Sequence, residues 1–342
     1  MNQTRAVVLA SRPVGEPGPE SFRLEDRELP ALADGQVLLR TIYLSLDPYM
    51  RGRMNASRSY AAPVEVDAVM EGGTVSEVLE SRCDDLAPGD LVVAHAGWQT
   101  HAVMDGTAVR KVSVGSAPVS TALGVLGMPG FAAYAGLAEI GRVQPGETLV
   151  VAAASGAVGS AVGQIARIRG ARTVGIAGGP RKVAWLTEIG FDVALDHRDP
   201  RFADRLADAV PGGIDVYFEN VGGAVWDAVF PHLNDFARVP VCGLISQYNT
   251  TTAPPGPDRL PALMTAINVK RLVVRGFTQR DLLASHYEAF QREMTSWVAE
   301  GRVAYLEDVV DGLENAPRAF LGLLRGENFG KLVVRVGPEP TL

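Results

Sequence analysis

The chain has 342 residues, which is long for one domain and sufficient for two. Its 47% hydrophobic and 21% charged residues are typical of a globular enzyme, and its net charge of −7 argues against a dedicated nucleic-acid or anionic-membrane binder. Two cysteines, Cys83 and Cys242, are too few for a disulfide scaffold or a four-cysteine zinc lobe. The apolar run near the start, residues 6–10, is too short for a signal peptide, and no run approaches the roughly twenty residues of a membrane-spanning helix. We therefore expect a cytoplasmic protein.

Residues 1–120 are β-rich and irregular. Strands are predicted at 6–10, 36–44, 74–79 and 90–94, separated by turns that contain proline and glycine. Residues 302–342 return to β-like and mixed character and end in a strand at 331–336. The simplest organisation is a β-rich domain formed by residues 1–122 and 301–342, with a second domain, 123–300, inserted into it.

The inserted segment alternates strands and helices. After a helical stretch at 120–141, strands are predicted at 148–153, 173–177, 193–195, 214–219, 237–242 and 272–277. Helices are predicted at 158–169, 181–189, 202–210 and 224–230, followed by a long amphipathic helix at 282–300. This alternation predicts an α/β fold with a doubly wound parallel sheet.

The first strand of this segment runs into a turn of small residues that opens a helix. The turn contains Gly156, Ala157, Val158 and Gly159. Glycines let the backbone approach a pyrophosphate, and the N–H groups and positive dipole end of the helix favour an anion there. The pattern is incomplete, because Ala154 stands where the first glycine of a dinucleotide-binding loop is usual. Close packing of any strand on a helix is the alternative explanation.

The second strand indicates which nucleotide would bind. An NAD-selective site usually has an acidic residue at this position, which binds the ribose 2′-hydroxyl. Here the strand ends in Gly178 and Gly179, and Arg181 and Lys182 follow on the next helix. A 2′-phosphate would be repelled by a carboxylate and attracted by these cations, so we expect NADPH rather than NADH. The alternative is that both cations are solvated helix charges.

Two later strand ends carry polar and glycine residues. The fourth strand is followed by Asn220 and two glycines, and the fifth by the segment 242–249. The carboxyl ends of parallel strands meet at one edge of a sheet, where ligands bind. We therefore expect both segments to contact the ligand, although plain turns would also use glycine.

Several motifs together resemble one family. They are YLSLDPYMRGRM at 43–54, AAASGAVGS, YFENVGG, CGLISQYN and GENFGKLVV. The sequence is similar to the zinc-independent medium-chain dehydrogenase/reductases, in the branch of the prostaglandin reductases and curcumin reductase. The resemblance implies a GroES-like catalytic domain, a Rossmann NADPH-binding domain and, usually, a homodimer. It also implies NADPH-dependent reduction of the C=C bond of α,β-unsaturated ketones or aldehydes.

The resemblance also assigns cofactor contacts. Lys182 matches a lysine that binds the 2′-phosphate, and His197 stands where relatives often have a tyrosine near that phosphate. Asn328 matches an asparagine that reaches the cofactor from the catalytic domain. The remaining cofactor contacts are Gly156, Ala157, Val158, Gly159, Gly178, Asn220, Cys242, Gly243, Ile245, Ser246, Tyr248, Phe277 and Thr278.

No zinc ligand set is expected. Zinc relatives carry a cysteine and a Gly-His-Glu motif, where this chain has Ser45 and the segment Met70-Glu71-Gly72-Gly73. His95 and His101 have no cysteine or acid at ligand spacing.

Catalysis without a metal needs a donor for the enolate oxygen that develops when hydride adds to an enone. The donor is a side-chain hydroxyl, a backbone N–H or a ribose hydroxyl of the cofactor, and a tyrosine O–H suits this role at neutral pH. The family places a functional tyrosine at Tyr248, and Tyr60 also matches a tyrosine that faces the substrate. Tyr49 and Met128 are expected to line the substrate pocket. Arg51 and Arg53 either attract an acidic substrate tail or form structural ion pairs.

Two other functions remain open at this point. Relatives with similar domains reduce quinones by one-electron chemistry, and some members of the superfamily bind NADPH without catalysis.

Overall fold

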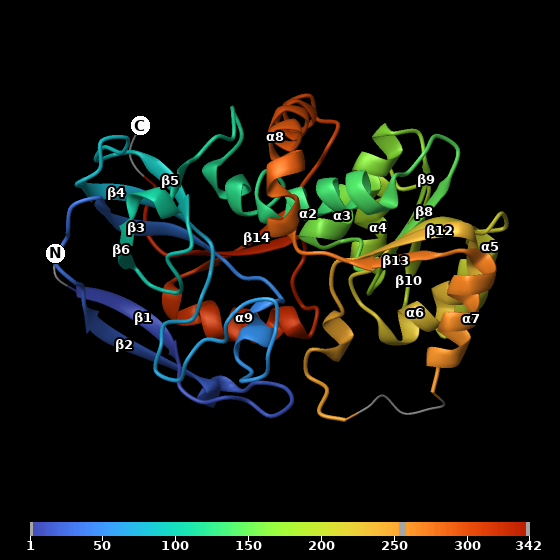
Figure 1. Ribbon diagram of the computed structural model, residues 1–342, viewed down its shortest axis with the longest axis horizontal. Helices are drawn as coiled ribbons and strands as arrows, with labels where there is room; N and C mark the ends of the chain where they lie inside the picture. The colour runs from blue at the N-terminus through green and yellow to red at the C-terminus, as the bar shows by residue number, and fades with distance from the viewer. Residues whose placement is uncertain (1–2, 253–257, 340–342) are drawn as a thin grey trace. The chain divides into compact units, whose positions relative to one another are not determined.

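The structure is a computed structural model that describes residues 3–252 and 258–339. Contacts divide the chain into two compact units. The first comprises Met1–Leu123 and Glu307–Leu342, and the second comprises Gly124–Leu306 (Figure 1). Residues 253–257, between Asn249 and Leu260, lie outside the described residues.

The first unit is built on a seven-stranded sheet. Its strand order is β14-β15-β3-β4-β5-β7, with β6 paired to β3, and all pairs except β14 with β15 are antiparallel. A separate antiparallel pair, β1 with β2, completes the strands. The bounds are β1 Gln3–Leu9, β2 Phe22–Glu28, β3 Gln36–Ser45, β4 Thr74–Ser81, β5 Leu91–Ala94, β6 His101–Asp105, β7 Arg110–Lys111, β14 Glu307–Asp311 and β15 Lys331–Arg335, with helices α1 Met50–Arg53 and α9 Ala316–Leu324.

Three aromatic rings form the centre of the core of the first unit. Trp98 is fully buried and stacks on Phe22, with centroids 5.7 Å apart and an interplanar angle of 6°. Phe320 of α9 meets Trp98 edge-on at 5.6 Å. Offset stacked and edge-to-face contacts are the favoured aromatic geometries. The expectation of only β-like and mixed structure after residue 302 was incomplete, because α9 supplies one of these rings.

The second unit contains a six-stranded sheet in which every pair of neighbouring strands is parallel. Its strand order is β10-β9-β8-β11-β12-β13. This order reverses at β8, as in a doubly wound nucleotide-binding fold. The predicted fold class is confirmed. The bounds are β8 Thr148–Val151, β9 Arg172–Ala177, β10 Val193–Asp196, β11 Ile214–Phe218, β12 Leu233–Val241 and β13 Val273–Gly276, with helices α2 Met128–Gly136, α3 Ala157–Ile168, α4 Pro180–Glu188, α5 Phe202–Ala209, α6 Gly223–Val229, α7 Leu260–Lys270 and α8 Leu283–Ala299.

Helices cover both faces of this parallel sheet (Figure 1). Residues of α5 and α6 pack with β8, β9 and β12 in one core cluster, and α7 packs beside it. On the other face, α3 and α4 meet at Phe191. A Cβ on Gly163 of α3 would lie 1.9 Å from the Phe191 ring. Gly163 therefore serves helix packing and not the phosphate turn.

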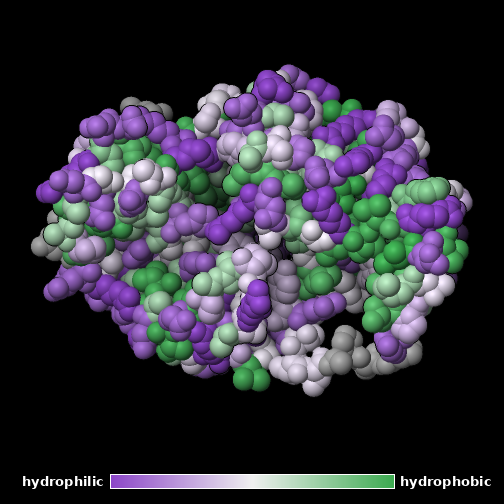
Figure 2. All heavy atoms as spheres, viewed as in Figure 1, coloured by the Kyte–Doolittle hydropathy of each residue, from purple (hydrophilic) through white to green (hydrophobic). Residues whose placement is uncertain are grey.

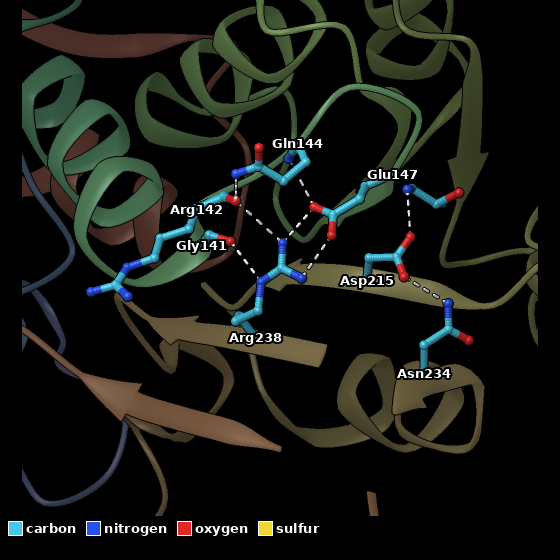
Figure 3. A network of polar contacts seen from close by, with 8 residues as sticks. Gly141, Arg142, Gln144, Glu147, Asp215, Asn234 and Arg238 are labelled. Carbon is cyan, nitrogen blue, oxygen red and sulfur yellow. Dashed lines mark hydrogen bonds and ion pairs between the residues drawn. The ribbon is translucent and has the colours of Figure 1, made fainter. Parts of the chain in front are cut away.

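A polar network fastens the strands at the edge of the sheet where they begin (Figure 3). Arg238 pairs with the Glu147 carboxylate and donates its Nε–H to the carbonyl oxygen of Gly141 at 2.9 Å. Asp215 accepts the first amide N–H of β8 at 2.9 Å and the side-chain amide of Asn234 at 2.8 Å. These contacts fix the amino ends of β8, β11 and β12, and leave the opposite edge for ligands.

None of the helices within residues 3–252 and 258–339 has the length and apolar character needed to cross a membrane.

Candidate functional site

The turn after β8 brings its backbone unusually close to helix α3. Ala153 has φ of 50°, in the left-handed region that non-glycine residues rarely occupy. A Cβ on Gly159 would lie 2.4 Å from the Ala153 carbonyl oxygen and 2.7 Å from the Ala154 Cα. Gly159 is therefore required by this close approach. Gly156 caps the helix and Ala157 begins it, so the first-turn N–H groups, which have no intrahelical acceptor, lie at the carboxyl edge of the sheet.

Basic side chains gather around Gly178, at the end of β9. A Cβ there would lie 2.8 Å from His197 Nε2 and 3.0 Å from Arg198 Nε. Partial desolvation, followed by the positive charges of Arg198 and Lys182, lowers the pKa of His197. Lys182 lies in the first turn of α4. The structure thus brings Gly178, Lys182 and His197 together, as a 2′-phosphate site requires.

The acidic residue nearest this cluster is turned to the backbone. Asp196, the last residue of β10, accepts the backbone N–H of Arg198 at 2.9 Å and that of Gly179. Burial opposes its ionisation, but these two N–H groups and the adjacent cations lower the pKa of Asp196. Its charge stabilises the turn that presents Arg198. Sequence reasoning missed Arg198, although the His-Arg pair directly after the third parallel strand was a usable signal.

The ends of β11 and β12 are hydrogen-bonded to each other and to β8. Asn220 Nδ2 donates to the Ala152 carbonyl oxygen at 2.8 Å. The amides of Cys242 and Gly243 donate to the Glu219 carbonyl oxygen at 2.9 and 3.2 Å. Farther along, the amides of Ile245 and Ser246 donate to the carbonyl oxygens of residues 220 and 221, at 3.2 and 3.1 Å. Residues predicted from separate segments to contact the cofactor therefore form one continuous edge.

Glu219 is a residue that sequence reasoning missed. Its side chain is 1% exposed. Oε1 accepts the backbone N–H groups of Val221 at 2.6 Å and Gly222 at 2.9 Å, and the Tyr217 hydroxyl at 3.1 Å. Burial raises the pKa of Glu219 in spite of these donors. The carboxyl group folds the chain after β11 into the turn that carries Asn220.

The phenol of Tyr248 lies next to the residues that directly follow β12. Its phenol oxygen accepts the Leu244 N–H at 3.4 Å, and a Cβ on Gly243 would lie 3.1 Å from it. Gly243 therefore leaves the space that the phenol occupies. Burial raises the pKa of the nearby Cys242 thiol to about 12, so it stays protonated at neutral pH.

Phe277 and Thr278 follow β13, and their side chains are engaged within the unit. The Phe277 ring packs edge-on against Phe218 at 6.2 Å, and a Cβ on Gly136 would lie 2.7 Å from it. Thr278 caps the next turn, and its N–H and hydroxyl both donate to Asp281. The Thr278 N–H is thus already hydrogen-bonded to the Asp281 carboxylate. Met128, the first residue of α2, is half-buried.

The remaining predicted site residues belong to the first unit. Asn328 donates its side-chain amide to the Gly330 carbonyl oxygen at 2.9 Å. Tyr49 and Tyr60 both lie close to the Arg53 guanidinium, with ring centroids 5.8 and 4.4 Å from its Cζ. The structure brings these two tyrosines together around one cation.

Arg51 and Arg53 are both buried, at 2% and 3% exposure. Arg51 donates to the side chain of Asn55 at 2.7 Å and to the Gly15 carbonyl oxygen at 2.6 Å. Arg53 forms an ion pair with Glu71 at 2.9 Å. Of the two interpretations of these arginines, the structural one fits these contacts, and a direct role in attracting an acidic substrate tail does not.

The positions that correspond to zinc ligands in relatives are engaged otherwise. The Ser45 hydroxyl donates to Asp47, which pairs with Lys331 at 2.9 Å, and Glu71 pairs with Arg53. In the part of the chain that the structure describes, no three His, Cys, Asp or Glu side chains are grouped as metal ligands would be. The absence of zinc remains a prediction.

Comparisons with known proteins agree with this geometry. A family described as the N-terminal domain of oxidoreductase matches residues 5–112, and one described as zinc-binding dehydrogenase matches residues 157–300. The chain is 54% identical to the NADPH-dependent curcumin reductase of Escherichia coli, over 98% of both chains. It is 42% identical to prostaglandin reductase 1 of Bos taurus, over 94% of this chain and 96% of that one. The chain belongs to the medium-chain dehydrogenase/reductase family.

The fold of this medium-chain dehydrogenase/reductase is shared by solved relatives. The crystal structure of CurA from Vibrio vulnificus in complex with NADPH superposes with a TM-score of 0.94, at 52% identity over 98% of this chain and 100% of that one. The predicted family and branch are confirmed. The roles of individual residues in this medium-chain dehydrogenase/reductase remain predictions, which the following proposals develop.

Proposed function

We propose that this medium-chain dehydrogenase/reductase uses NADPH to reduce the C=C bond of α,β-unsaturated ketones and aldehydes. The observation that supports NADPH as the cofactor is the basic cluster around Gly178, beside which the Asp196 carboxylate accepts backbone N–H groups. Support for the reaction comes from relatives with the names NADPH-dependent curcumin reductase and prostaglandin reductase 1.

The residues present fit NADPH. The backbone N–H groups of the first turn of α3 suit a pyrophosphate, and the glycine at 159 lets that turn approach the backbone of Ala153 and Ala154 closely. Lys182, His197 and Arg198 would hold the 2′-phosphate, since such clusters bind phosphate oxygens through charge-assisted hydrogen bonds. When bound, NADPH supplies the hydride that adds to the β-carbon of the enone.

Tyr248 is proposed as the donor to the carbonyl oxygen of the substrate. Negative charge develops there as the enolate forms, and a positioned O–H lowers the barrier. The Tyr248 oxygen accepts the Leu244 N–H, and a hydroxyl that accepts one hydrogen bond becomes a better donor through polarisation. Tyr60, Tyr49 and Met128 are proposed to contact the substrate, and Asn328 the cofactor. The α-carbon then takes up a proton.

The deciding experiment measures NADPH oxidation with a panel of enals, aliphatic and aromatic enones, and quinones, with product analysis. We expect the saturated ketone or aldehyde as product. Oxidation with quinones alone would replace this proposal by quinone reduction. Cofactor binding without oxidation of NADPH by any compound would indicate a non-catalytic binding protein.

We also infer a homodimer, formed through the edge strand β13. Val273 and Val274 on this strand are 47% and 36% exposed. The neighbouring helix α7 exposes Leu260, Met264 and Val269. Figure 2 shows hydrophobic residues over the same part of the second unit. A bare apolar edge strand is a template for pairing with another chain, and a second copy of β13 matches it.

Sedimentation of the wild type and of Val274→Lys tests this assembly. We expect a dimer and a monomer respectively, whereas a monomeric wild type contradicts the inference.

We further propose a cytoplasmic location, because the reaction draws on the reduced cofactor pool of the cell. Fractionation tests it.

A further inference from the structure

Arg53 lies at the centre of a cluster in the first unit that contains two of the tyrosines proposed to contact substrate. It is the last residue of α1 and is 3% exposed. Its Cζ is 4.4 Å from the centroid of the Tyr60 ring and 5.8 Å from that of Tyr49. A guanidinium within about 6 Å of a ring centroid is attracted by the ring quadrupole. The nearer and stronger contact is therefore with Tyr60.

Arg53 also fastens the segment that carries Tyr60. Its Nη1 donates to the Ala61 carbonyl oxygen at 2.9 Å, and its own carbonyl oxygen accepts the Val64 N–H at 2.8 Å. Between α1 and β4 this segment forms no helix or strand. Tyr60 itself is 66% exposed. Arg53 thus contacts the segment both at this largely exposed ring and after it.

We propose that Arg53 is a positioning residue, which holds Tyr60 in the orientation that binds the enone. Arg53 does not touch the substrate in this proposal, and its effect passes through the Tyr60 ring. The proposal rests on the proposed function, because it assumes that Tyr60 contacts the substrate.

The chemistry of the guanidinium explains why arginine suits this position. Its flat face stacks on aromatic rings while the N–H groups at its edge donate in the plane. Arg53 uses both properties, because it covers Tyr60, donates to Ala61 and pairs with Glu71 at 2.9 Å. The ammonium group of lysine is a point charge and cannot form this set of contacts at once.

The electrostatics of the cluster keep the phenol of Tyr49 protonated. Burial, followed by the negative charges of Asp47 and Glu71, raises the pKa of Tyr49, and Arg53 partly opposes this. Tyr49 therefore remains a neutral hydrogen-bonding ring in the physiological pH range. In this proposal Arg53 controls the orientation of the Tyr60 ring.

The test compares Arg53→Gln and Arg53→Lys with Arg51→Gln. Arg51 is the matched control, because it is 2% exposed on the same helix but donates to Asn55 and Gly15. We expect Arg53→Gln to raise KM for an aromatic enone about tenfold, to change kcat less than about threefold and to leave KM for NADPH unchanged. Arg53→Lys should recover only part of the loss. An equal rise in KM for Arg51→Gln would overturn the proposal.

A double-mutant cycle shows whether the effect passes through Tyr60. If it does, Arg53→Gln adds little to the KM of Tyr60→Ala. Independent, multiplying effects would show that Arg53 acts elsewhere and would refute the proposal.

Hydrogen exchange supplies a readout that does not depend on activity. We expect faster exchange in residues 55–66 of Arg53→Gln, with little change in Arg51→Gln. Unchanged exchange of residues 55–66 in Arg53→Gln would contradict the proposal that Arg53 holds this segment in place. Wild type that reduces no enone refutes the proposed function, and with it the substrate role of Tyr60, whereas normal wild-type activity with unaltered KM in Arg53→Gln refutes this inference alone.

Discussion

His197 Nε2 lies 2.8 Å from the point where a Cβ on Gly178 would stand, so the imidazole occupies the space left by the missing side chain. Desolvation and the charges of Arg198 and Lys182 lower the pKa of His197, and it is neutral at pH 7 before the cofactor binds. A bound 2′-phosphate favours the imidazolium form and raises that pKa again. Binding therefore takes up a proton, and acidification favours it.

The affinity for NADPH should accordingly rise as the pH falls from about 8 to about 6.5, by roughly threefold and by no more than tenfold per pH unit. NADH should show no such trend, and His197→Gln should flatten it for NADPH. Fluorescence titration of both cofactors across this range measures the effect. A steeper rise in His197→Gln than in the wild type would contradict the assignment. Below about pH 6 the phosphate itself takes up a proton, which limits the usable window.

Lys182→Ala should weaken NADPH binding selectively. A hydrogen bond to a charged group contributes about 1.5–3 kcal/mol, so we expect KM for NADPH to rise tenfold or more while KM for NADH stays within about twofold. Steady-state kinetics with both cofactors measures this. Lys111→Ala is the control, because that lysine pairs with Asp90 in the first unit. Equal losses for NADPH and NADH would refute the phosphate assignment of Lys182.

Tyr248→Phe should lower turnover without loosening the cofactor. Removing one donor to a developing oxyanion typically costs about 10²–10³ in kcat. We expect a fall of at least about thirtyfold in kcat, with KM for NADPH within about twofold. Tyr43→Phe, which loses the bond from a phenol of the first unit to Glu339, controls for the loss of a hydroxyl. Unchanged turnover in Tyr248→Phe would assign the enolate to another donor.

Glu219→Ala should damage the cofactor edge, while Glu219→Gln should largely preserve it. Alanine leaves the N–H groups of Val221 and Gly222 without their acceptor, whereas the amide oxygen of glutamine still accepts them. For Glu219→Ala we expect a fall of roughly 5–10 °C in melting temperature and about a tenfold rise in KM for NADPH.

Glu307→Gln is the matched control for this prediction. Burial also raises the pKa of Glu307, and its carboxylate accepts the Ser120 hydroxyl at 2.7 Å in the first unit. It should leave KM for NADPH unchanged. If Glu219→Gln behaves like the alanine variant, the carboxylate charge, and not its acceptor geometry, is what matters.

The alternation of elements between residues 148 and 300 was predictable, because each strand and helix has its own apolar period. Within the described residues three α-helices were not predicted, namely the single turn α1, α7 and α9. Among the described residues α7 has no buried residue, so its sequence shows no apolar stripe that would predict a helix. α9 carries the short apolar run Phe320–Leu324, and such a run reads equally well as a strand. The predicted strand 237–242 begins earlier, at Leu233, and includes Phe236 with a φ of 62° that breaks the pattern.

Parts of the candidate site followed from sequence for a different reason. Gly178 and Lys182 were identified because an expected acid is absent. Arg198 was missed although the His-Arg pair after β10 was a usable signal, whereas the importance of Glu219 depends on how the chain folds back after β11. No periodicity marks a carboxylate that accepts amides two and three residues ahead. The Arg53 cluster likewise joins α1 to a segment without regular structure, and no sequence pattern shows that the two lie together.

The stacked rings in the core of the first unit have an optical consequence. Of the four tryptophans, Trp98 alone belongs to that unit, and Trp185, Trp226 and Trp297 belong to the other. Trp98 is shielded from water and lies against Phe22 and Phe320, so its emission will be blue-shifted in the native state and will move to longer wavelength when this core opens. In a variant with phenylalanine in place of the other three tryptophans, the fluorescence emission of Trp98 would thus follow the melting of the first unit alone.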